Sequence, residues 1–334
     1  RFDGRMRSAI GVRRHAGVDD VHACLDGLKV AQRRHAGCKV AVQVDRRLDR
    51  GLERLDQVAA DEPRATWRNR LLRLVEKRYL DRVDGFVFNS YSTRDTVWRL
   101  TAADRPHVVA PPGGDRLGAP LSSAAIRARA REPAPLRLLF LGNLIPRKGL
   151  LPLIHALAGL PHPPWELRVV GRLDMNAAYV RRVRYKLAAR GLAGRVQLVG
   201  RREGASLAAE LKRAQLLCMP YAYEGFGMAT LEAQAFGLPV IGAREGATGE
   251  LISDGVNGYL VRRGDHAAVC RVLAALDADR TKLAQMGLSA RRRFGRHPTW
   301  AGTMERLAVF LETLAASRRP RRRPFSAGLK AVSP

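Results

Sequence analysis

This chain of 334 residues contains two acidic residues, Glu224 and Glu232, whose side chains and spacing suit a binding or catalytic site. Glu224 lies in a loop in which Gly225 and Gly227 flank Phe226, and the two glycines leave backbone amides open to an anion. The helix expected to follow directs its positive N-terminus to the same place. This arrangement indicates a site for a negatively charged ligand, whereas the alternative interpretation is a pair of solvated acids.

The two carboxylates have different expected tasks. Glu232 lies about two turns inside the expected helix, from which its carboxylate could accept two hydrogen bonds from a vicinal diol such as a ribose. Glu224 lies before that helix, where it could bind sugar hydroxyls or support a developing positive charge.

The second group of residues, 140–149, is an expected strand that ends in a glycine-containing loop. Gly142 lets a ligand approach the backbone closely, and Asn143 follows it. Arg147 and Lys148 could neutralise a diphosphate, to which the start of the next helix adds a partial positive charge. The spacing of a Walker A loop is missing, and an ordinary surface turn is the alternative.

A third loop, residues 243–250, follows another expected strand. We interpret Glu250 in this loop as a structural residue whose carboxylate caps the start of a helix. Asn257 and Gly258, a little further on, predict a hairpin-like turn.

The three loops share one architecture, because strands and helices alternate regularly from residue 136 onward. Such alternation predicts βαβ units and a parallel sheet, in which ligands bind beyond the carboxyl ends of the strands. The expected strands are 136–141, 167–170, 196–199, 216–219, 239–242 and 258–261. The expected helices are 150–160, 178–190, 206–213, 230–236, 266–277, 279–294 and 300–316.

The first 135 residues show weaker patterns, and residues 1–60 are rich in Arg, Asp and His with little periodicity. In chain order, we expect a helix at 67–80, a strand at 85–90, a helix at 94–100 capped by Ser92 or Thr93, a strand at 107–110, a turn at 111–114 and a linker at 119–135.

Composition limits the class of protein. Apolar residues make up 46% of the chain, which is enough for a real core. An apolar run long enough to span a membrane is absent, and no apolar segment follows the basic start as in a secretory signal. The four cysteines, Cys24, Cys38, Cys218 and Cys270, match no zinc spacing, so we expect no metal, and reduced thiols fit a cytoplasmic protein.

The formal net charge of +28 attracts polyanions without choosing among them. The densest cluster runs from Arg318 to Arg323, in a tail that we expect to be disordered. This tail is either a solvated segment or a contact with an anionic membrane surface. We do not expect nucleic acid as a partner, because no aromatic residues interleave with the cations.

Together these residues resemble glycosyltransferase family 4, or glycosyl transferases group 1, a family of retaining enzymes with the GT-B fold. The resemblance runs from about residue 67 to residue 311, and its core is the pair of glutamates with seven residues between them. The pattern that continues this motif is Ala233, Gly237, Pro239 and Val240. Further matches are Val87–Ser90, Val109–Asp115, Val170–Gly171, Val199–Gly200 and Asn257–Gly258.

The resemblance implies an α/β protein with two Rossmann-like domains that face a cleft, and a nucleoside diphosphate sugar bound to the second domain. It implies that Lys148 binds the diphosphate, that Glu232 binds the ribose, and that Glu224 and the amides near Phe226 and Gly227 hold the donor sugar, with no metal and no cofactor besides the donor. We therefore expect Glu224 to be the catalytic residue. The donor-binding residues expected in this chain are Gly142, Asn143, Arg147, Lys148, Gly225, Phe226, Gly227, Met228 and Glu232.

The chain departs from the family pattern in two places. Asn143 stands where family members carry Arg, and Arg147 is the expected substitute. No family-like glycine-rich loop or acceptor-side histidine precedes Trp67, so we interpret residues 1–65 as truncated or misread and the N-terminal domain as incomplete. The remaining expected divisions are an acceptor-side domain at 66–118, a linker at 119–135, a donor-binding domain at 136–300, a helix at 301–316 and a basic tail at 317–334.

The expected function is transfer of a sugar from a nucleotide donor to an acceptor that the sequence does not identify, with retention of configuration. Two alternatives remain open. One is a catalytically impaired nucleotide-sugar-binding protein, and the other is a basic protein that binds nucleic acid or an anionic membrane surface. We expect a cytoplasmic location, with peripheral attachment at the inner face of the membrane as a further expectation.

Overall fold

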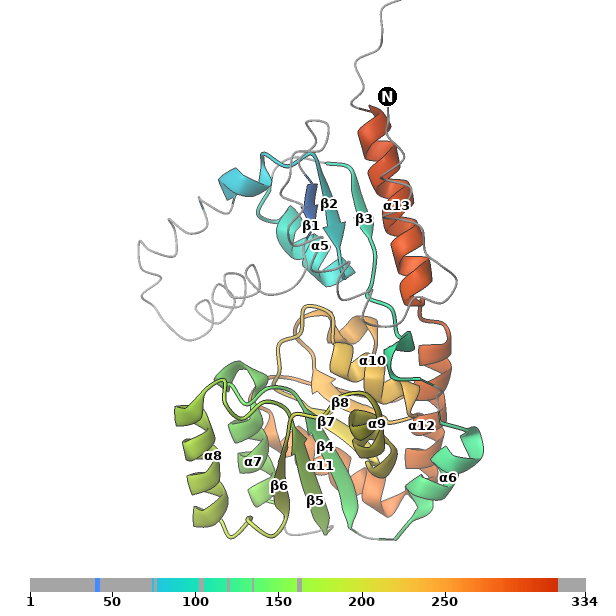
Figure 1. Ribbon diagram of the computed structural model, residues 1–334. Helices are drawn as coiled ribbons and strands as arrows, with labels where there is room; N and C mark the ends of the chain where they lie inside the picture. Colours follow the sequence, from blue (N-terminus) through green and yellow to red (C-terminus); the bar gives the residue numbers. More distant parts are fainter. Residues whose placement is uncertain are drawn as a thin grey trace, which may run out of the picture.

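The computed structural model of this chain describes residues 40–42, 74, 77–101, 105–118, 121–133, 135–160 and 164–317. These residues build two parallel sheets, one above the other in Figure 1, and we call the parts that contain them the first and the second domain. Our predictions for Cys24, for Cys38 and for the cluster between Arg318 and Arg323 lie outside the described residues.

The sheet of the first domain has the order β1-β2-β3, with β1 (Val40–Val42), β2 (Gly85–Phe88) and β3 (His107–Val109) all parallel. Helix α5 (Tyr91–Trp98) packs on it, and the ring of Trp98 lies 5.4 Å from that of Phe86 and 5.1 Å from that of Phe88. Edge-to-face contacts of this kind add stability beyond the buried area. They fix the position of α5 on the sheet.

The predicted start of α5 was wrong by three residues, because the N-cap is Ser90 and not Ser92 or Thr93. Ser90 Oγ accepts a hydrogen bond of 3.0 Å from the backbone amide of Thr93. All three hydroxyl residues have the chemistry of an N-cap. Ser90 is the N-cap because it is the first of the three after the end of the buried strand β2.

The sheet of the second domain has the order β6-β5-β4-β7-β8-β9, and all its strands are parallel, as predicted. Its strands are β4 (Leu136–Leu141), β5 (Trp165–Val170), β6 (Val196–Gly200), β7 (Leu216–Met219), β8 (Val240–Ala243) and β9 (Gly258–Val261). Its main helices are α7 (Leu150–Ala158), α8 (Ala177–Ala189), α9 (Gly204–Arg213), α10 (Met228–Ala235), α11 (His266–Ala278) and α12 (Arg280–Gly295).

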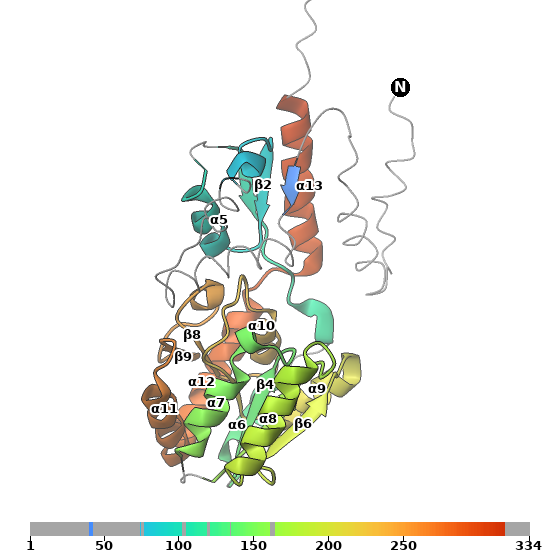
Figure 2. The ribbon, with the colours of Figure 1, turned by 90° about the vertical axis from the view of Figure 1, so that its left-hand side faces the viewer.

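The strand order explains where the helices lie. The chain moves outward from β4 to β5 and β6, then crosses to β7 and continues outward the other way to β8 and β9. Because such crossovers are right-handed, the crossover helices α7 and α8 lie on one face of the sheet, and the crossover helices α9 and α10 lie on the other. Helices α7, α8 and α11 cover one face, seen in Figure 2, and α9, α10 and α12 the other. The direction reverses between β4 and β7, which makes this pair the point where a ligand is expected.

Two predictions for this domain need correction. Within residues 119–135, expected as a linker, residues 123–131 form helix α6 (Ser123–Arg131), which packs against α12. The turn near Asn257 and Gly258 is not a hairpin, because β8 and β9 run parallel. Asn257 is instead buried, where its side chain accepts from the amide of Ser253 at 2.7 Å and donates to Leu251 O at 3.0 Å.

The last helix, α13 (Trp300–Ser317), returns from the second domain to the first and runs beside β3 (Figures 1 and 2). Its Leu307 and Phe310 pack against Val87 and Val108 of the first sheet. The chain therefore crosses between the domains twice, before and after the second domain. Across the parts of the chain that the structure describes, no helix has both the length and the hydropathy needed to cross a bilayer.

Candidate active site at the ends of strands β4 and β7

The loop after β4 carries the first group of predicted site residues. Gly142 donates its backbone amide to Val170 O at 2.9 Å, and a side chain on Gly171 would come within 2.0 Å of Gly142 O. The two loops are therefore in backbone contact, which explains the glycine at position 171. Asn143 Oδ1 accepts a 3.2 Å hydrogen bond from the amide of Arg172, so Asn143 joins the same two loops.

Lys148 is positioned by a short helical turn, η2 (Pro146–Lys148), and by Gly149 after it. Gly149 has φ +72° and would meet Tyr221 at 2.6 Å if it carried a Cβ atom, so the position requires glycine. Lys148 lies two residues before α7, next to Arg147 in the chain, and is half-buried. A cation and the positive end of a helix thus lie together at the carboxyl end of β4.

The structure brings Lys148 and Glu224 into direct contact. Lys148 Nζ donates to Glu224 Oε1 at 2.5 Å, and the two side chains are only 15% and 18% exposed. The backbone of Glu224 is also fixed, since Glu224 O accepts from the amide of Ala247 at 2.9 Å. Gly246, with φ +80°, lies so close that a Cβ atom would meet Glu224 O at 2.6 Å. The loops after β4, β7 and β8 therefore converge on this ion pair.

Gly227 ends the loop after β7 as the N-cap of α10, with φ +102° and no side-chain hydrogen bond to the helix. Residue Phe226 is 6% exposed and packs against Leu231 and Leu251. The Phe226 side chain thus anchors the loop in the protein, and the backbone from Gly225 to Gly227 leads directly into the start of the helix. Free amides at a helix start attract anions.

Glu232 lies one turn inside α10, and not two turns as expected, because the helix begins at Met228. Its side chain is buried, since the residue is 6% exposed. Burial raises the pKa of its carboxyl above the usual range, and the charge of Arg116 opposes this shift. Arg116 Nη2 donates to Glu232 Oε1 in a close ion pair. Arg116 comes from η1 (Asp115–Leu117), in the first of the two crossings between the domains.

Sequence reasoning identified Glu232 but missed Arg116, because the two residues are 116 positions apart and nothing in the local sequence joins them. It also expected Glu250 to cap a helix, and this is confirmed: the Glu250 carboxylate accepts from the amides of Tyr91 and Ser92 at the start of α5. Among the residues that the structure describes, no three His, Cys, Asp or Glu side chains are grouped to hold a metal ion.

Solved structures share this fold. The structure matches sucrose-phosphate synthase from Thermosynechococcus elongatus with a TM-score of 0.70 and 24% identity, over 87% of this chain and 71% of that one. It matches Anabaena Alr3699/HepE, solved in complex with UDP and glucose, with a TM-score of 0.66 and 20% identity, over 88% of this chain and 76% of that one. The two parallel α/β domains are those of the GT-B fold.

Curated relatives agree at the level of sequence. D-inositol 3-phosphate glycosyltransferase of Corynebacterium kroppenstedtii is 30% identical over 252 residues, which are 72% of this chain and 55% of the relative. Phosphatidyl-myo-inositol mannosyltransferase of Mycobacterium leprae is 32% identical over 186 residues, which are 54% of this chain and 47% of the relative. This chain thus spans about half the length of these relatives. The family model for glycosyl transferases group 1 matches residues 123–293, and the chain belongs to that family.

Proposed function

We propose that this protein is a glycosyltransferase that transfers a sugar from a nucleoside diphosphate sugar to an acceptor hydroxyl, with retention of configuration. The observation that carries the proposal is the contact between Lys148 and Glu224, where two strand ends meet at the reversal of the strand order. A half-buried ion pair at this position holds a cation ready for an anionic ligand. Family membership favours the same donor class.

The residues have complementary proposed roles. Lys148 and the amides at the start of α10 would bind the diphosphate, and the buried carboxylate of Glu232 would accept hydrogen bonds from the ribose diol. As the bond between the anomeric carbon and the diphosphate oxygen breaks, the electron pair leaves with the diphosphate, which Lys148 and the backbone amides stabilise. The acceptor oxygen then bonds to the anomeric carbon on the face that the diphosphate leaves, and its proton passes to an oxygen of the departing diphosphate, while Glu224 lies beside the reacting sugar.

For the acceptor we propose an inositol that carries a phosphate group. Two curated relatives support this choice, since one is named for D-inositol 3-phosphate and the other for phosphatidyl-myo-inositol. Both names describe the same chemistry, an inositol ring joined to a phosphate, in a water-soluble and in a lipid-linked form. The experiment has to distinguish these two forms.

The test starts from thermal shift measurements with UDP-glucose, GDP-mannose and related donors, because a ligand that binds the folded state raises its melting temperature. The stabilising donor is then incubated with inositol 3-phosphate or with phosphatidylinositol in vesicles, and the product is analysed by NMR for its anomeric configuration. We expect one donor to stabilise the protein and one acceptor form to be glycosylated with retention.

The outcomes separate the alternatives. If no nucleotide sugar stabilises the protein, the proposed function is wrong. If a donor binds but is neither transferred nor hydrolysed, the protein is a nucleotide-sugar-binding protein without turnover. The Lys148→Ala variant is the matched control, because the proposal requires that it lose the donor-induced stabilisation while the protein stays folded.

A further inference from the structure

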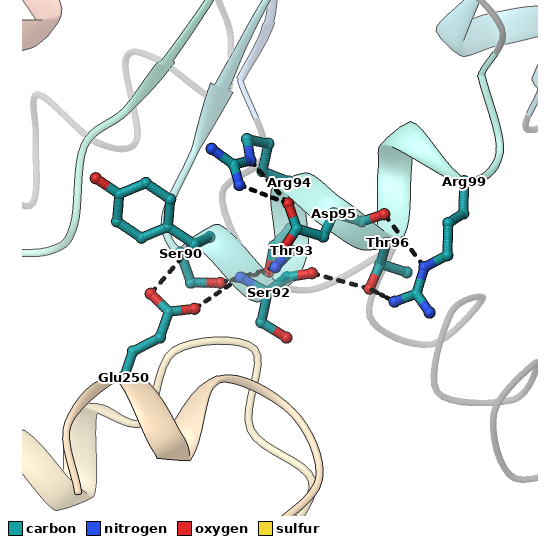
Figure 3. Close-up of polar contacts among 9 residues, drawn as sticks. Ser90, Ser92, Thr93, Arg94, Asp95, Thr96, Arg99 and Glu250 are labelled. Atoms are coloured by element: carbon teal, nitrogen blue, oxygen red, sulfur yellow. Dashed lines mark hydrogen bonds and ion pairs between the residues drawn. The ribbon is translucent and has the colours of Figure 1, made fainter. Parts of the chain in front are cut away.

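The first domain touches the second through the start of helix α5, as Figure 3 shows. Glu250, which belongs to the turn η3 (Ala247–Glu250) of the second domain, accepts hydrogen bonds from the amides of Tyr91 and Ser92 at 3.0 and 2.7 Å. These amides are the first two of α5 and have no partner within the helix. A carboxylate at this position combines a charge-assisted hydrogen bond with the attraction of the helix dipole.

A second contact lies beside the first. Ser90 Oγ donates to Gly225 O at 2.7 Å, and Thr93 Oγ1 lies 3.2 Å from the same oxygen. Ser90 is fully buried, and it is also the N-cap of α5. The start of α5 therefore docks on the second domain with both its backbone amides and its capping side chain.

These contacts reach the ion pair of the proposed site through the backbone. Gly225 follows Glu224 directly, and while Gly225 O binds the first domain, Glu224 O binds the amide of Ala247 at the start of η3. The turn itself is held by Arg293, whose Nη2 donates to Glu250 O at 2.7 Å. Two consecutive carbonyl groups of the loop that carries Glu224 are thus fixed, one by η3 and the other by α5.

We propose that Glu250 and Ser90 form an interdomain latch, which docks the first domain on the second and holds the loop with Glu224 in the arrangement required for sugar transfer. Both are positioning residues. This inference rests on the proposed function, in which Lys148 and Glu232 bind the nucleotide without any contribution from α5. Opening the latch should therefore lower turnover more than it lowers the affinity for the nucleotide.

The experiment compares Glu250→Ala and Ser90→Ala with the matched control Glu245→Ala. Glu245 lies in the same loop and is exposed, and among the described residues its one hydrogen-bond partner is the amide of Arg263 in its own domain, at 3.3 Å. For each full-length variant we would measure the radius of gyration by small-angle X-ray scattering, the dissociation constants of UDP and GDP by calorimetry, and kcat for transfer.

We expect Glu250→Ala to increase the radius of gyration and to lower kcat about tenfold, with nucleotide dissociation constants within about twofold of wild type. Glu250→Asp, which keeps the charge but shortens the side chain, should fall between Glu250→Ala and wild type. Ser90→Ala should act in the same direction, and Glu245→Ala should match wild type in all three measurements.

Two results would contradict the proposed latch. In the first, Glu250→Ala has the same radius of gyration and the same kcat as Glu245→Ala. In the second, Glu250→Ala loses as much nucleotide affinity as it loses kcat. Should Glu250→Ala fail to fold, Ser90→Ala and Glu250→Asp carry the same comparison. Should wild type bind neither UDP nor GDP, the proposed donor site is wrong, but the scattering comparison still decides whether Glu250 holds the domains together.

Discussion

The carboxylate of Glu232 is the most deeply buried acid of the proposed site, and its charge depends on one neighbour. Burial raises the pKa of Glu232, while Arg116 lowers it through its charge and its hydrogen bond. A ribose diol donates hydrogen bonds most effectively to an ionised carboxylate, because a charged acceptor roughly doubles their strength. Arg116 should therefore keep Glu232 in the form that binds the nucleotide.

We predict that Arg116→Gln makes nucleotide binding more dependent on pH. Without the arginine, the pKa of Glu232 rises further, so that more of the carboxyl is protonated at mildly acid pH and affinity increases as the pH rises. Calorimetry with UDP or GDP at pH 5.5 and 8.0 should show a difference in affinity several times larger in the variant than in wild type. Arg127→Gln removes an exposed arginine of α6 and should behave as wild type. Parallel pH profiles for all three proteins would contradict the role of Arg116.

A second prediction concerns the ion pair between Lys148 and Glu224. The carboxylate of Glu224 is paired with Lys148 in the structure. A diphosphate that binds Lys148 therefore has to compete with this carboxylate for the same cation. Glu224→Gln should therefore leave the affinity for UDP or GDP unchanged or raise it severalfold, while transfer falls by at least about a hundredfold. Lys148→Gln should weaken nucleotide affinity by about tenfold or more. The two substitutions should thus move binding in opposite directions, and a loss of affinity in Glu224→Gln as large as in Lys148→Gln would contradict this assignment.

At the level of single residues, the sequence predicted the site residues within one motif better than it predicted contacts between residues far apart in the chain. Lys148 and Glu224 both follow buried strands, and parallel strands bring their carboxyl ends to one edge, so the sequence predicted their proximity. Arg116 lies in a Pro- and Gly-rich segment with no periodic pattern. Only the packing of that segment against the second domain brings Arg116 to Glu232, and no local rule of spacing describes such packing.

Among the elements, the strands and helices of the second domain were predictable because their apolar residues alternate with turns at regular lengths. Helix α6 was not, since its only large apolar residue is Ile126. Its stability comes from tertiary packing, which overrides a weak local pattern. Ile126 packs where helix α12 crosses the segment that follows α10. The contact is made by Gly287 of α12 and Gly237 of that segment.

We predict that Gly287→Ala destabilises the protein. A Cβ atom at position 287 would lie 2.7 Å from Gly237 O and 2.9 Å from Ile126 Cγ2, so that α6 and α12 would have to move apart. Overpacking of this kind lowers the free energy of unfolding by about 1–3 kcal/mol. The control is Gly295→Ala in the same helix, where the nearest atom is the flexible Arg291 side chain at 3.5 Å. It should be neutral or slightly stabilising in urea unfolding, and equal effects of the two substitutions would contradict close packing at Gly287.

For the whole molecule, the two crossings between the domains lie side by side. A Cβ atom on Gly113 would come within 2.1 Å of the Trp300 backbone nitrogen, and the amide of Trp300 donates to Asp115 Oδ1 at 2.8 Å. His297 adds a contact of 2.8 Å between its Nε2 atom and Pro112 O. The sequence predicted neither contact, because each joins residues 185 positions apart. The relative position of the domains thus depends on packing at this junction and on the start of α5.

The junction where the two crossings meet contains His297, and this histidine should make the free energy of unfolding depend on pH. Burial lowers the pKa of His297 below its usual value of 6.5, Arg293 lowers it further, and only the hydrogen bond with Pro112 O raises it. In the unfolded chain this histidine takes up a proton near pH 6.5, whereas in the folded protein it stays neutral to lower pH. Between the two values the unfolded state binds more protons, so the free energy of unfolding falls as the pH drops below about 6.5.

We therefore predict that His297→Gln, which can still donate to Pro112 O but does not titrate, loses less stability between pH 7.5 and pH 5.5 than wild type does. Other titrating groups are common to both proteins, so the difference between their two slopes isolates His297. Urea unfolding at a series of pH values measures it, and the same substitution at the exposed His155 controls for the loss of a histidine as such. Identical slopes for wild type and His297→Gln would mean that the junction opens to water, and the two crossings would then not hold the domains as a packed unit.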